Sequence, residues 1–472
     1  MKQRFEFNPF LKKYRKGLRR VALVYPNRYI GGIANVGLQY IYAKVNELDA
    51  VCERFYSDVF NGLRSLETAT PLKDFDIALF SLQYEMDYFK AVEIIRKSGF
   101  SGLKIAGGPC VMENPKPLMN YFDAFFIGEV EDSIEEIVFA RDREELEGIK
   151  GIYTGREDRV KRVYVNLGKH LESEIIGDGA YGRCFLLEIG RGCIRKCRFC
   201  LVRNIYFPPR WRKIENLPDI KLVNKVALIA PSPSDHPNFK EILANFVERG
   251  YEVSPSSVRA DTIDEELIEL LKNAKLKSLT IAPEAASEHL VEILNKGISV
   301  EDVLRVSELS SGVFEKIKLY FMIGLPNESL EDVKKIIELA LKVKSYVKRV
   351  EISVNPLVPK PHTPFQWLPF GGKDDIKEGI KELRDKVKLL KAECRKHGIE
   401  ADISNVKEFA IQTILSRGNE DVSRIFDGVS YTEFLSYLER IDIDAELPWD
   451  FIDHGYKKSK LVNEYLKVIT YL

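Results

Sequence analysis

Three closely spaced cysteines are the residues of this sequence with the clearest chemical meaning. Cys193, Cys197 and Cys200 fall within the stretch CIRKCRFC, whereas the rest of the seven cysteines are scattered. A structural zinc site needs four ligands, and no fourth cysteine or histidine stands nearby. Scattered single cysteines are typical of a reducing compartment, which disfavours a disulfide. Three thiolates on a short loop instead predict a four-iron, four-sulfur cluster with one iron open to an outside ligand.

The region before these cysteines must be a folded α/β unit. Between residues 21 and 140, short apolar runs alternate with amphipathic helical patterns, which predicts a doubly wound parallel sheet. The expected strands include VALVY from Val21, DIALFSL from Asp76 and LKIAGG from Leu103. Ligands of such sheets bind beyond the carboxyl ends of the strands, so we expect the loops after these runs to face a ligand.

A second alternating pattern contains the cysteines themselves. Six strand-helix units predict a partial (β/α)6 barrel over residues 181–370, with chemistry at the carboxyl ends of its strands. The expected strands are CFLLEIG from Cys184, KVALIA from Lys225, YEVSPSSV from Tyr251, LKSLTIA from Leu276, KIKLYFMIG from Lys316 and RVEISVNPL from Arg349. The cysteine stretch directly follows the first of them, where barrel chemistry is expected.

The remaining segments frame these two units. We expect an N-terminal extension at 1–20, a Rossmann-like domain at 21–140, a connecting segment at 141–180, the barrel at 181–370 and a mostly helical region at 371–472. In the connecting segment, GIYTG and VKRVYVN flank a polar turn. We expect these two runs to pair as a hairpin.

Composition limits the classes of partner. The chain has 472 residues, with 71 Lys plus Arg and 71 Asp plus Glu, so its net charge near zero indicates no nucleic-acid partner. We find no apolar run near the ~20 residues that a membrane-spanning helix needs. The expectation is therefore a cytoplasmic protein without a membrane partner.

The cysteine stretch resembles the signature of the radical S-adenosylmethionine superfamily. Later stretches are similar, in order and spacing, to a branch of it with an N-terminal cobalamin-binding-like domain: TIAPEAASEHL from Thr280, KLYFMIGLPNES from Lys318 and NPLVPKPHTPFQW from Asn355. In that superfamily S-adenosylmethionine chelates the open iron, and an electron from the cluster cleaves it to a 5′-deoxyadenosyl radical. The resemblance implies a [4Fe-4S] cluster, S-adenosylmethionine, and a reductant protein as the partner that supplies the electron.

The resemblance also implies cofactor contacts at single positions. Phe199 lies against the adenine, and Glu284 binds the ribose hydroxyls. Arg259 pairs with the methionine carboxylate, and Gly324 lets the backbone approach the adenine. Three of these have a structural alternative: Glu284 as a helix cap, Arg259 as a rim salt bridge and Gly324 as a turn.

Two features of the barrel stay open. The usual glycine-glycine-glutamate element after the second strand is replaced by APSPSDHP, where backbone carbonyls near Ser232 are the expected substitute for holding the amino group of S-adenosylmethionine. The sequence identifies no catalytic acid or base. His362, on a proline-rich loop after the sixth strand, is a candidate, and a structural loop histidine is an equal alternative.

The first domain resembles cobalamin-binding domains but departs from them at one position. Those domains carry D-x-H-x-x-G after the first strand, with the histidine on cobalt; here NRYIGG puts Tyr29 at the histidine position and keeps Gly32. The other expected contacts persist as Ser81, Gly107, Gly108 and Gly128. The resemblance implies cobalamin held without a lower protein ligand, or with Tyr29 near the cobalt. The alternative is a domain that binds no cobalamin and recognises a partner.

Three functional hypotheses follow. The first is a radical S-adenosylmethionine enzyme that transfers a methyl group by way of cobalamin to an unactivated carbon. The second is a cobalamin-free radical enzyme for oxidation, rearrangement or sulfur insertion. The third is a cluster-bearing binding protein without turnover. The sequence names no substrate.

Overall fold

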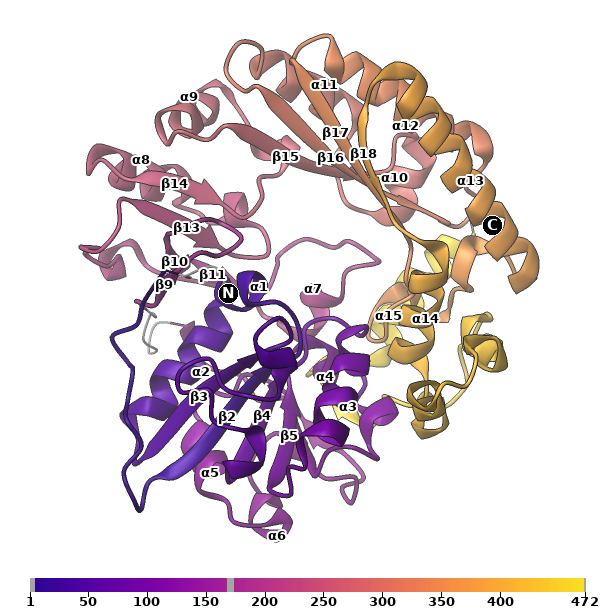
Figure 1. Cartoon of the computed structure of the whole chain (residues 1–472). Helices are drawn as coiled ribbons and strands as arrows, with labels where there is room; N and C mark the ends of the chain where they lie inside the picture. Colours follow the sequence, from indigo (N-terminus) through magenta and orange to yellow (C-terminus); the bar gives the residue numbers. More distant parts are fainter. Residues whose placement is uncertain (1–4, 168–173, 471–472) are drawn as a thin grey trace.

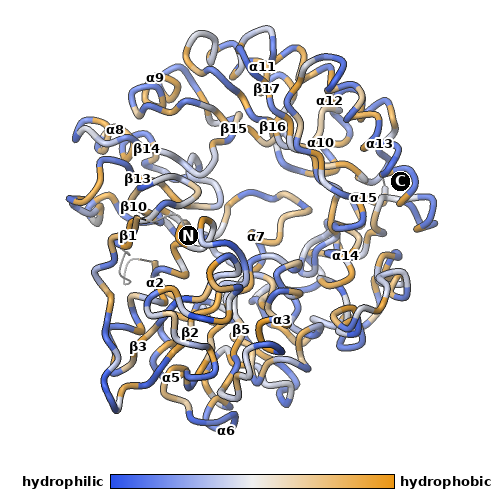
Figure 2. Tube along the Cα trace, viewed as in Figure 1, coloured by the Kyte–Doolittle hydropathy of each residue, from blue (hydrophilic) through white to orange (hydrophobic). Residues whose placement is uncertain are grey.

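The computed structural model describes residues 5–167 and 174–470 (Figure 1). The N-terminal α/β unit forms the lower part of the view, and the open barrel forms the upper part. The C-terminal segments run down one side and join the two. Hydrophobic residues follow the central strands, whereas the outer helices α12 and α13 carry long hydrophilic stretches (Figure 2). Within the described ranges, no helix is both long and apolar enough to span a membrane.

The N-terminal unit contains the expected doubly wound sheet. Its strands lie in the order β3-β2-β4-β5-β6-β7, parallel except for β7. The strands are β2 (Arg19–Tyr25), β3 (Ala50–Tyr56), β4 (Ile77–Ser81), β5 (Leu103–Gly107), β6 (Ala124–Phe126) and β7 (Ile152–Tyr153). The helices are α1 (Tyr29–Gly32), α2 (Val36–Glu47), α3 (Asp87–Ser98), α4 (Pro109–Glu113), α5 (Ile134–Phe139) and α6 (Arg143–Leu146). The predicted fold class of this region is confirmed.

Local sequence explains where these helices begin and end. The side chain of Asn35 accepts the Leu38 N–H and caps the first turn of α2. Helix α3 ends at Gly99, whose positive φ of 66° suits a residue without a Cβ. Both helices then pack on a sheet whose central strand β2 is fully buried from Val21 to Val24. The carboxyl ends of the strands therefore point together toward one edge.

The barrel contains all six expected strands and one more. The strands form two parallel groups, β10-β13-β14 and β15-β16-β17-β18, that are not hydrogen-bonded to each other, so the barrel is open. They are β10 (Phe185–Glu188), β13 (Lys225–Ile229), β14 (Glu252–Pro255), β15 (Ser278–Glu284), β16 (Lys316–Ile323), β17 (Arg349–Pro356) and β18 (Glu400–Ile403). The additional strand β18 comes from the region expected to be mostly helical.

Helices cover the outer face of the barrel. They are α8 (Phe239–Glu248), α9 (Glu265–Asn273), α10 (Glu288–Leu294), α11 (Val300–Leu309), α12 (Leu330–Lys344) and α13 (Ile376–His397). Ser299 and Ser329 form capping boxes at the starts of α11 and α12, each with the aspartate three residues on. Further along, α14 (Val406–Arg417) and α15 (Lys458–Ile469) belong to the C-terminal segments that reach back to the N-terminal unit.

The expected hairpin in the connecting segment is wrong. Strand β7 pairs antiparallel with β6, and β8 (Val160–Lys161) pairs parallel with β19 (Ile452–Asp453). The Tyr153 and Phe451 rings stack with centroids 4.3 Å apart beside this pairing. Because the C-terminal segment supplies a better-packed partner, the two runs join different sheets instead of each other.

A buried ion cluster joins the three parts of the chain. Lys360, on the loop after β17, contacts Glu85 after β4 and lies 3.1 Å from Glu113 at the end of α4. The second carboxylate oxygen of Glu85 accepts a hydrogen bond of 2.8 Å from Gln412 of α14. Both glutamates are buried, and the Lys360 side chain is 17% exposed. One lysine therefore faces two buried acids at this junction, where burial raises the pKa of Glu113 well above its usual value and lowers that of Lys360 to about 7.

Replacing Lys360 by methionine is expected to lower the free energy of unfolding by about 3–5 kcal/mol at pH 7. The change leaves the buried acids Glu85 and Glu113 without the cation that faces them, which is the costly way to break a buried ion pair. Urea denaturation measures the effect. The matched control is Glu420→Gln, which breaks an exposed pair with Lys116 between the same parts, and its expected loss is below about 1 kcal/mol. Equal losses in the two variants would contradict the argument.

Candidate functional site

The three cysteines lie on a loop closed by a short two-stranded stem. Strand β11 (Gly190–Arg191) pairs antiparallel with β12 (Arg210–Trp211), and the loop between them also carries α7 (Leu201–Ile205). Gly192 has φ 79°, and a Cβ there would stand 2.5 Å from the carbonyl oxygen of Tyr206. The loop therefore depends on glycine at this position. We call residues 190–211 the cysteine loop.

The cysteine loop is docked on the end of α10. The Arg198 N–H donates to the carbonyl oxygen of Leu294 at 3.0 Å, and its guanidinium donates to that of Glu292 at 2.8 Å. Asn295 in turn donates to the Lys196 carbonyl at 3.2 Å. The charged residues between the cysteines therefore fix the loop on the barrel.

The cysteine thiols are enclosed and face positive charge. All three are free, and burial raises the pKa of each, that of Cys197 to about 11. The nearby thiols act in the same direction on Cys197, whereas Lys296 and Arg259 lower its pKa. These cations favour the thiolate forms that iron requires. The cysteines thus share one electrostatic environment that suits an anionic cluster.

The cysteines do not form a site for a single ion. Within residues 5–167 and 174–470, no three His, Cys, Asp or Glu side chains are placed to hold one metal ion. A four-iron cluster sets a different requirement, because each thiolate binds its own iron and the sulfurs stay apart. The three free thiols lie on one loop that turns at Gly192, beside the cations Lys296 and Arg259. This arrangement suits three thiolates that each bind a different iron.

The residues expected to bind S-adenosylmethionine surround the loop. Glu284 ends β15 at φ 69°, beyond a shift in the strand register. Its carboxylate accepts a hydrogen bond of 2.5 Å from Lys296, whose ammonium lies 5.9 Å from the centroid of the Phe199 ring. A positive φ in a residue with a side chain is a strained conformation that is common at functional sites. The structure thus brings Glu284 and Phe199 to one place and adds Lys296, which no motif indicated.

Arg259 and Gly324 have structural roles of their own. The Arg259 guanidinium donates to both carboxylate oxygens of Asp261, at 2.9 and 3.0 Å, and to the Lys296 carbonyl at 2.8 Å. Gly324 has φ 78°, and a Cβ there would stand 2.9 Å from the Leu383 side chain on α13. Packing against Leu383 is enough to explain Gly324. Arg259 is already paired with Asp261, but its positive charge also lowers the pKa of Cys197.

The stretch that replaces the glycine-glycine-glutamate element offers one free polar group. The hydroxyl oxygen of Ser232 is buried and has no hydrogen-bond partner. Three residues on, Asp235 holds the Arg195 guanidinium of the cysteine loop at 2.9 Å. A buried hydroxyl without a partner is costly unless a ligand completes it. The role expected from the sequence concerned backbone carbonyls near Ser232 and stays a prediction, and the Ser232 hydroxyl is a further polar group of the same stretch.

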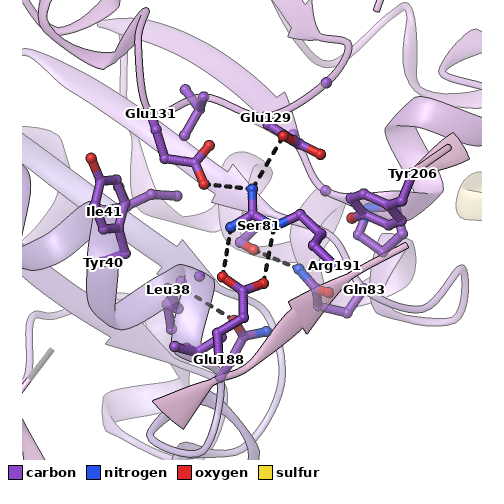
Figure 3. Close-up of a pocket in the computed structure, with 18 of the residues that line it drawn as sticks. Leu38, Tyr40, Ile41, Ser81, Gln83, Glu129, Glu131, Glu188, Arg191 and Tyr206 are labelled. Carbon is purple, nitrogen blue, oxygen red and sulfur yellow. Dashed lines mark hydrogen bonds and ion pairs between the residues drawn. The ribbon is translucent and has the colours of Figure 1, made fainter. Parts of the chain in front are cut away.

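A cavity of about 450 Å³ lies between the N-terminal sheet and the cysteine loop (Figure 3). The expected residues Ser81, Gly107, Gly108 and Gly128 all line it. The barrel side contributes Glu188, Gly190, Arg191, Val202, Tyr206 and Arg212. The carboxyl edge of the doubly wound sheet thus faces the loop that carries the cysteines, as the position of ligand sites in such sheets predicts.

Two glycines of the cavity wall are required by close packing of the backbone, and a third leaves open space. Gly108 has φ 105°, and a Cβ there would stand 2.5 Å from the carbonyl oxygen of Leu82. Gly128 has φ 131°, and a Cβ there would clash with the backbone of Val163. At Gly107 the nearest atom to an added Cβ is 3.9 Å away. Close backbone packing therefore shapes this wall around Ser81, whose hydroxyl accepts a 2.8 Å hydrogen bond from Gln83 (Figure 3).

Tyr29 and Gly32 do not line this cavity, and their contact with the cofactor stays a prediction. The Tyr29 hydroxyl donates to Glu6 at 2.7 Å, and burial raises its pKa. Glu6 belongs to β1 (Glu6–Phe7), which pairs with β9 (Ile176–Gly177) and encloses the tyrosine. A Cβ on Gly32 would clash with the Tyr56 ring. The residue that replaces the histidine is therefore part of the packing.

Asp87 is a buried acid that accepts a hydrogen bond from Asn27, the first residue of the NRYIGG stretch. Asn27 donates to one of its carboxylate oxygens at 2.7 Å, and the other has no partner. Burial raises its pKa to about 6. The folded state therefore binds a proton more tightly than the unfolded state, and this contribution is lost as the pH rises from about 4 to about 6.

Replacing Asp87 by asparagine is expected to stabilise the protein by about 2–3 kcal/mol above pH 7 and to change nothing below pH 4. The amide keeps the acceptor for Asn27 and removes the penalty of a buried charge. Thermal or urea unfolding across this pH range measures the difference. A gain that is the same at pH 4 and pH 8 would contradict the assignment to ionisation.

His362 is structural in this fold. One ring nitrogen lies 2.7 Å from the Tyr456 hydroxyl and the other 3.1 Å from the Glu113 carbonyl oxygen. Its ring is buried edge-on against His454 with centroids 4.4 Å apart. Burial holds the pKa of His362 well below its usual value, so the ring stays neutral. Of the two interpretations from the sequence, the loop histidine matches these contacts.

Two family models match the N-terminal unit and much of the barrel. Residues 187–340 match the family model described as the radical SAM superfamily, and residues 37–165 match the one described as radical SAM proteins, N-terminal. An uncharacterized protein of Methanocaldococcus jannaschii is 40% identical over 462 residues, which is 94% of this chain and 99% of that protein.

Two solved structures share the overall fold. One is the radical S-adenosylmethionine methyltransferase TsrM from Kitasatospora setae with cobalamin and a [4Fe-4S] cluster bound: TM-score 0.55, 16% identity, 74% of each chain covered. The other is the cobalamin-dependent S-adenosylmethionine radical enzyme OxsB with aqua-cobalamin and S-adenosylmethionine bound: TM-score 0.53, 14% identity, 96% of this chain and 79% of that one. The likeness confirms the arrangement of a doubly wound unit, a barrel and a C-terminal region.

Proposed function

Because this chain belongs to the radical S-adenosylmethionine superfamily, we propose that it is a cobalamin-dependent methyltransferase that acts on an unactivated carbon. The cluster and S-adenosylmethionine supply radical chemistry when bound, and the corrinoid supplies a carrier for the methyl group. The observation that carries the proposal is the cavity between the N-terminal sheet and the cysteine loop. The bound cobalamin in TsrM and OxsB, which share the fold, supports the same assignment.

We assign each part of this reaction to residues of the chain. Cys193, Cys197 and Cys200 hold the cluster, and Lys296 and Arg259 balance its negative charge. Glu284 and Phe199 bind the nucleoside part of S-adenosylmethionine. When bound, S-adenosylmethionine would supply the 5′-deoxyadenosyl radical, and a second molecule of it would supply the methyl group. A reductant protein supplies the electrons.

The cavity wall fits a corrinoid held by its periphery. Ser81 and the backbone at Gly107 and Gly108 offer polar groups along the sheet edge. The histidine that binds cobalt in cobalamin-binding domains is missing from this sequence: Tyr29 takes its position, donates to Glu6 and does not line the cavity. Ser81 and the glycine backbone would therefore be the groups that hold the corrinoid.

That missing ligand is also the observation that favours the second candidate, a radical enzyme that uses no cobalamin. One experiment separates the two. The protein is reconstituted anaerobically with iron, sulfide and hydroxocobalamin, desalted, and assayed for iron, corrin absorption and 5′-deoxyadenosine. Retained corrin, together with transfer of isotope-labelled methyl from S-adenosylmethionine to a product, supports the methyltransferase. Cleavage of S-adenosylmethionine without retained corrin supports the second candidate. Absence of cleavage by the reduced protein would leave the cluster-bearing binding protein.

A further inference from the structure

A single glutamate from the N-terminal unit binds both ends of the cysteine loop. Glu129 follows β6 and Gly128, lines the cavity and is 4% exposed. One carboxylate oxygen accepts from Arg210 at 2.6 Å; the other accepts from Arg210 at 2.7 Å and lies 3.3 Å from the Arg191 guanidinium. The Val165 N–H donates to the same carboxylate at 2.9 Å. Glu129 thus has a complete set of partners, most of them from the loop.

The two arginines stand directly opposite each other in the stem. Arg191 of β11 and Arg210 of β12 are cross-strand partners, so like charges face each other where the loop closes. Facing cations destabilise a strand pair unless a counter-charge is shared. Glu129 provides that charge from the cavity wall. The Arg191 guanidinium also forms ion pairs with Glu188 at 2.8 Å and with Glu131 at 2.6 Å (Figure 3).

The same residues face the ligand space. Glu129, Glu131, Glu188 and Arg191 all line the cavity, and Arg191 stands two positions before Cys193. A molecule in the cavity therefore contacts the groups that close the cysteine loop. A ligand that prefers the closed stem must bind more tightly when the loop is fixed by its metal, and the reverse must hold equally.

We propose that Glu129 is a positioning residue that couples occupancy of the cavity to the cysteine loop through Arg191 and Arg210. The two states are a stem closed on Glu129 and a stem in which the arginines repel each other. This inference rests on the proposed function, since it takes the loop as the cluster site and the cavity as the corrinoid site. It adds that the two sites are thermodynamically linked.

The test is the affinity for hydroxocobalamin, measured by absorption titration of the full chain with and without the reconstituted cluster. In the native protein the cluster is expected to tighten binding at least about fivefold. In Glu129→Gln this ratio is expected to fall to within about twofold. A merely structural defect would weaken binding in both preparations and leave the ratio unchanged, so the ratio is the deciding quantity.

A matched control removes another anchor of the same loop. Glu464 of α15 pairs with Arg198 at 3.0 Å and does not line the cavity. Glu464→Gln is expected to keep the native ratio. Hydrogen exchange of the stem amides in the iron-free protein gives a second measure, with faster exchange expected in Glu129→Gln than in the native protein.

The outcomes are distinguishable. If cluster and corrin both bind to the native protein and the ratio is one, or if Glu129→Gln keeps the native ratio, the coupling is refuted while the proposed function stands. If the native protein binds no hydroxocobalamin, the proposed corrinoid site fails and the coupling fails with it. Unchanged hydrogen exchange in Glu129→Gln would also count against the role of the carboxylate in the stem.

Discussion

Replacing Cys193, Cys197 and Cys200 together by alanine is expected to remove the iron, about four atoms per chain, and to lower formation of 5′-deoxyadenosine at least about a hundredfold. The three thiols are the only free sulfhydryls of the described chain that share one loop. Without them no iron remains to bind S-adenosylmethionine. Iron analysis and quantitation of 5′-deoxyadenosine after anaerobic reconstitution measure both effects.

Two of the other four buried thiols provide the control for this experiment. Cys184 and Cys394 are buried away from the cysteine loop, and burial raises the pKa of each to about 11. Replacing each by alanine is expected to cost about 1 kcal/mol of stability and to leave the iron content unchanged. Native iron content or native nucleoside release in the triple variant would refute the cluster assignment.

Replacing Ile41 by tryptophan is expected to weaken hydroxocobalamin binding at least about a hundredfold while S-adenosylmethionine cleavage continues. Ile41 lies on α2, is half-buried and lines the cavity, so the larger ring extends into the ligand space (Figure 3). The cysteine loop is separate in sequence and keeps its own anchors on α10. Corrin absorption after desalting and release of 5′-deoxyadenosine test the two halves of the expectation.

The same substitution elsewhere on the N-terminal unit provides the comparison. Ile95 of α3 is also half-buried, packs on the core and does not line the cavity. Ile95→Trp is expected to keep the native corrin affinity, with a stability change of about 1–3 kcal/mol from overpacking. If Ile41→Trp bound corrin as well as the native protein, the cavity would not be the corrinoid site.

Continuous apolar runs made most of the fold predictable. The six expected strands of the barrel and β2, β4 and β5 are short apolar segments between helical patterns, and each appears where the sequence indicates it. Strand β3 was not predicted because Glu53 and Arg54 interrupt its apolar pattern. Both charges are buried: Arg54 pairs with Glu67 at 2.7 Å, and Glu53 accepts from Thr68 at 2.6 Å. A strand whose charges are satisfied by distant residues has no local signal.

Some residues of the candidate site could be predicted from the sequence and others could not. The cysteines, Ser81 and the cavity glycines belong to local motifs, so their positions could be predicted. Arg210 acts through Glu129, which is 81 residues away, and Lys296 acts through Glu284, so no local motif indicated either of them. The contact of Tyr29 with Glu6 could not be predicted for a related reason, because Glu6 stands in a segment without a periodic pattern.

The parallel pairing of β8 with β19 has a consequence for biosynthesis. Ile452 and Asp453 come far later in the sequence than Val160 and Lys161, the strand residues that they pair with. During translation the N-terminal unit emerges early, whereas this strand pair forms only when the later residues have left the ribosome. Every residue that lines the cavity, from Leu23 to Pro231, is therefore synthesised before the connecting segment receives its last support.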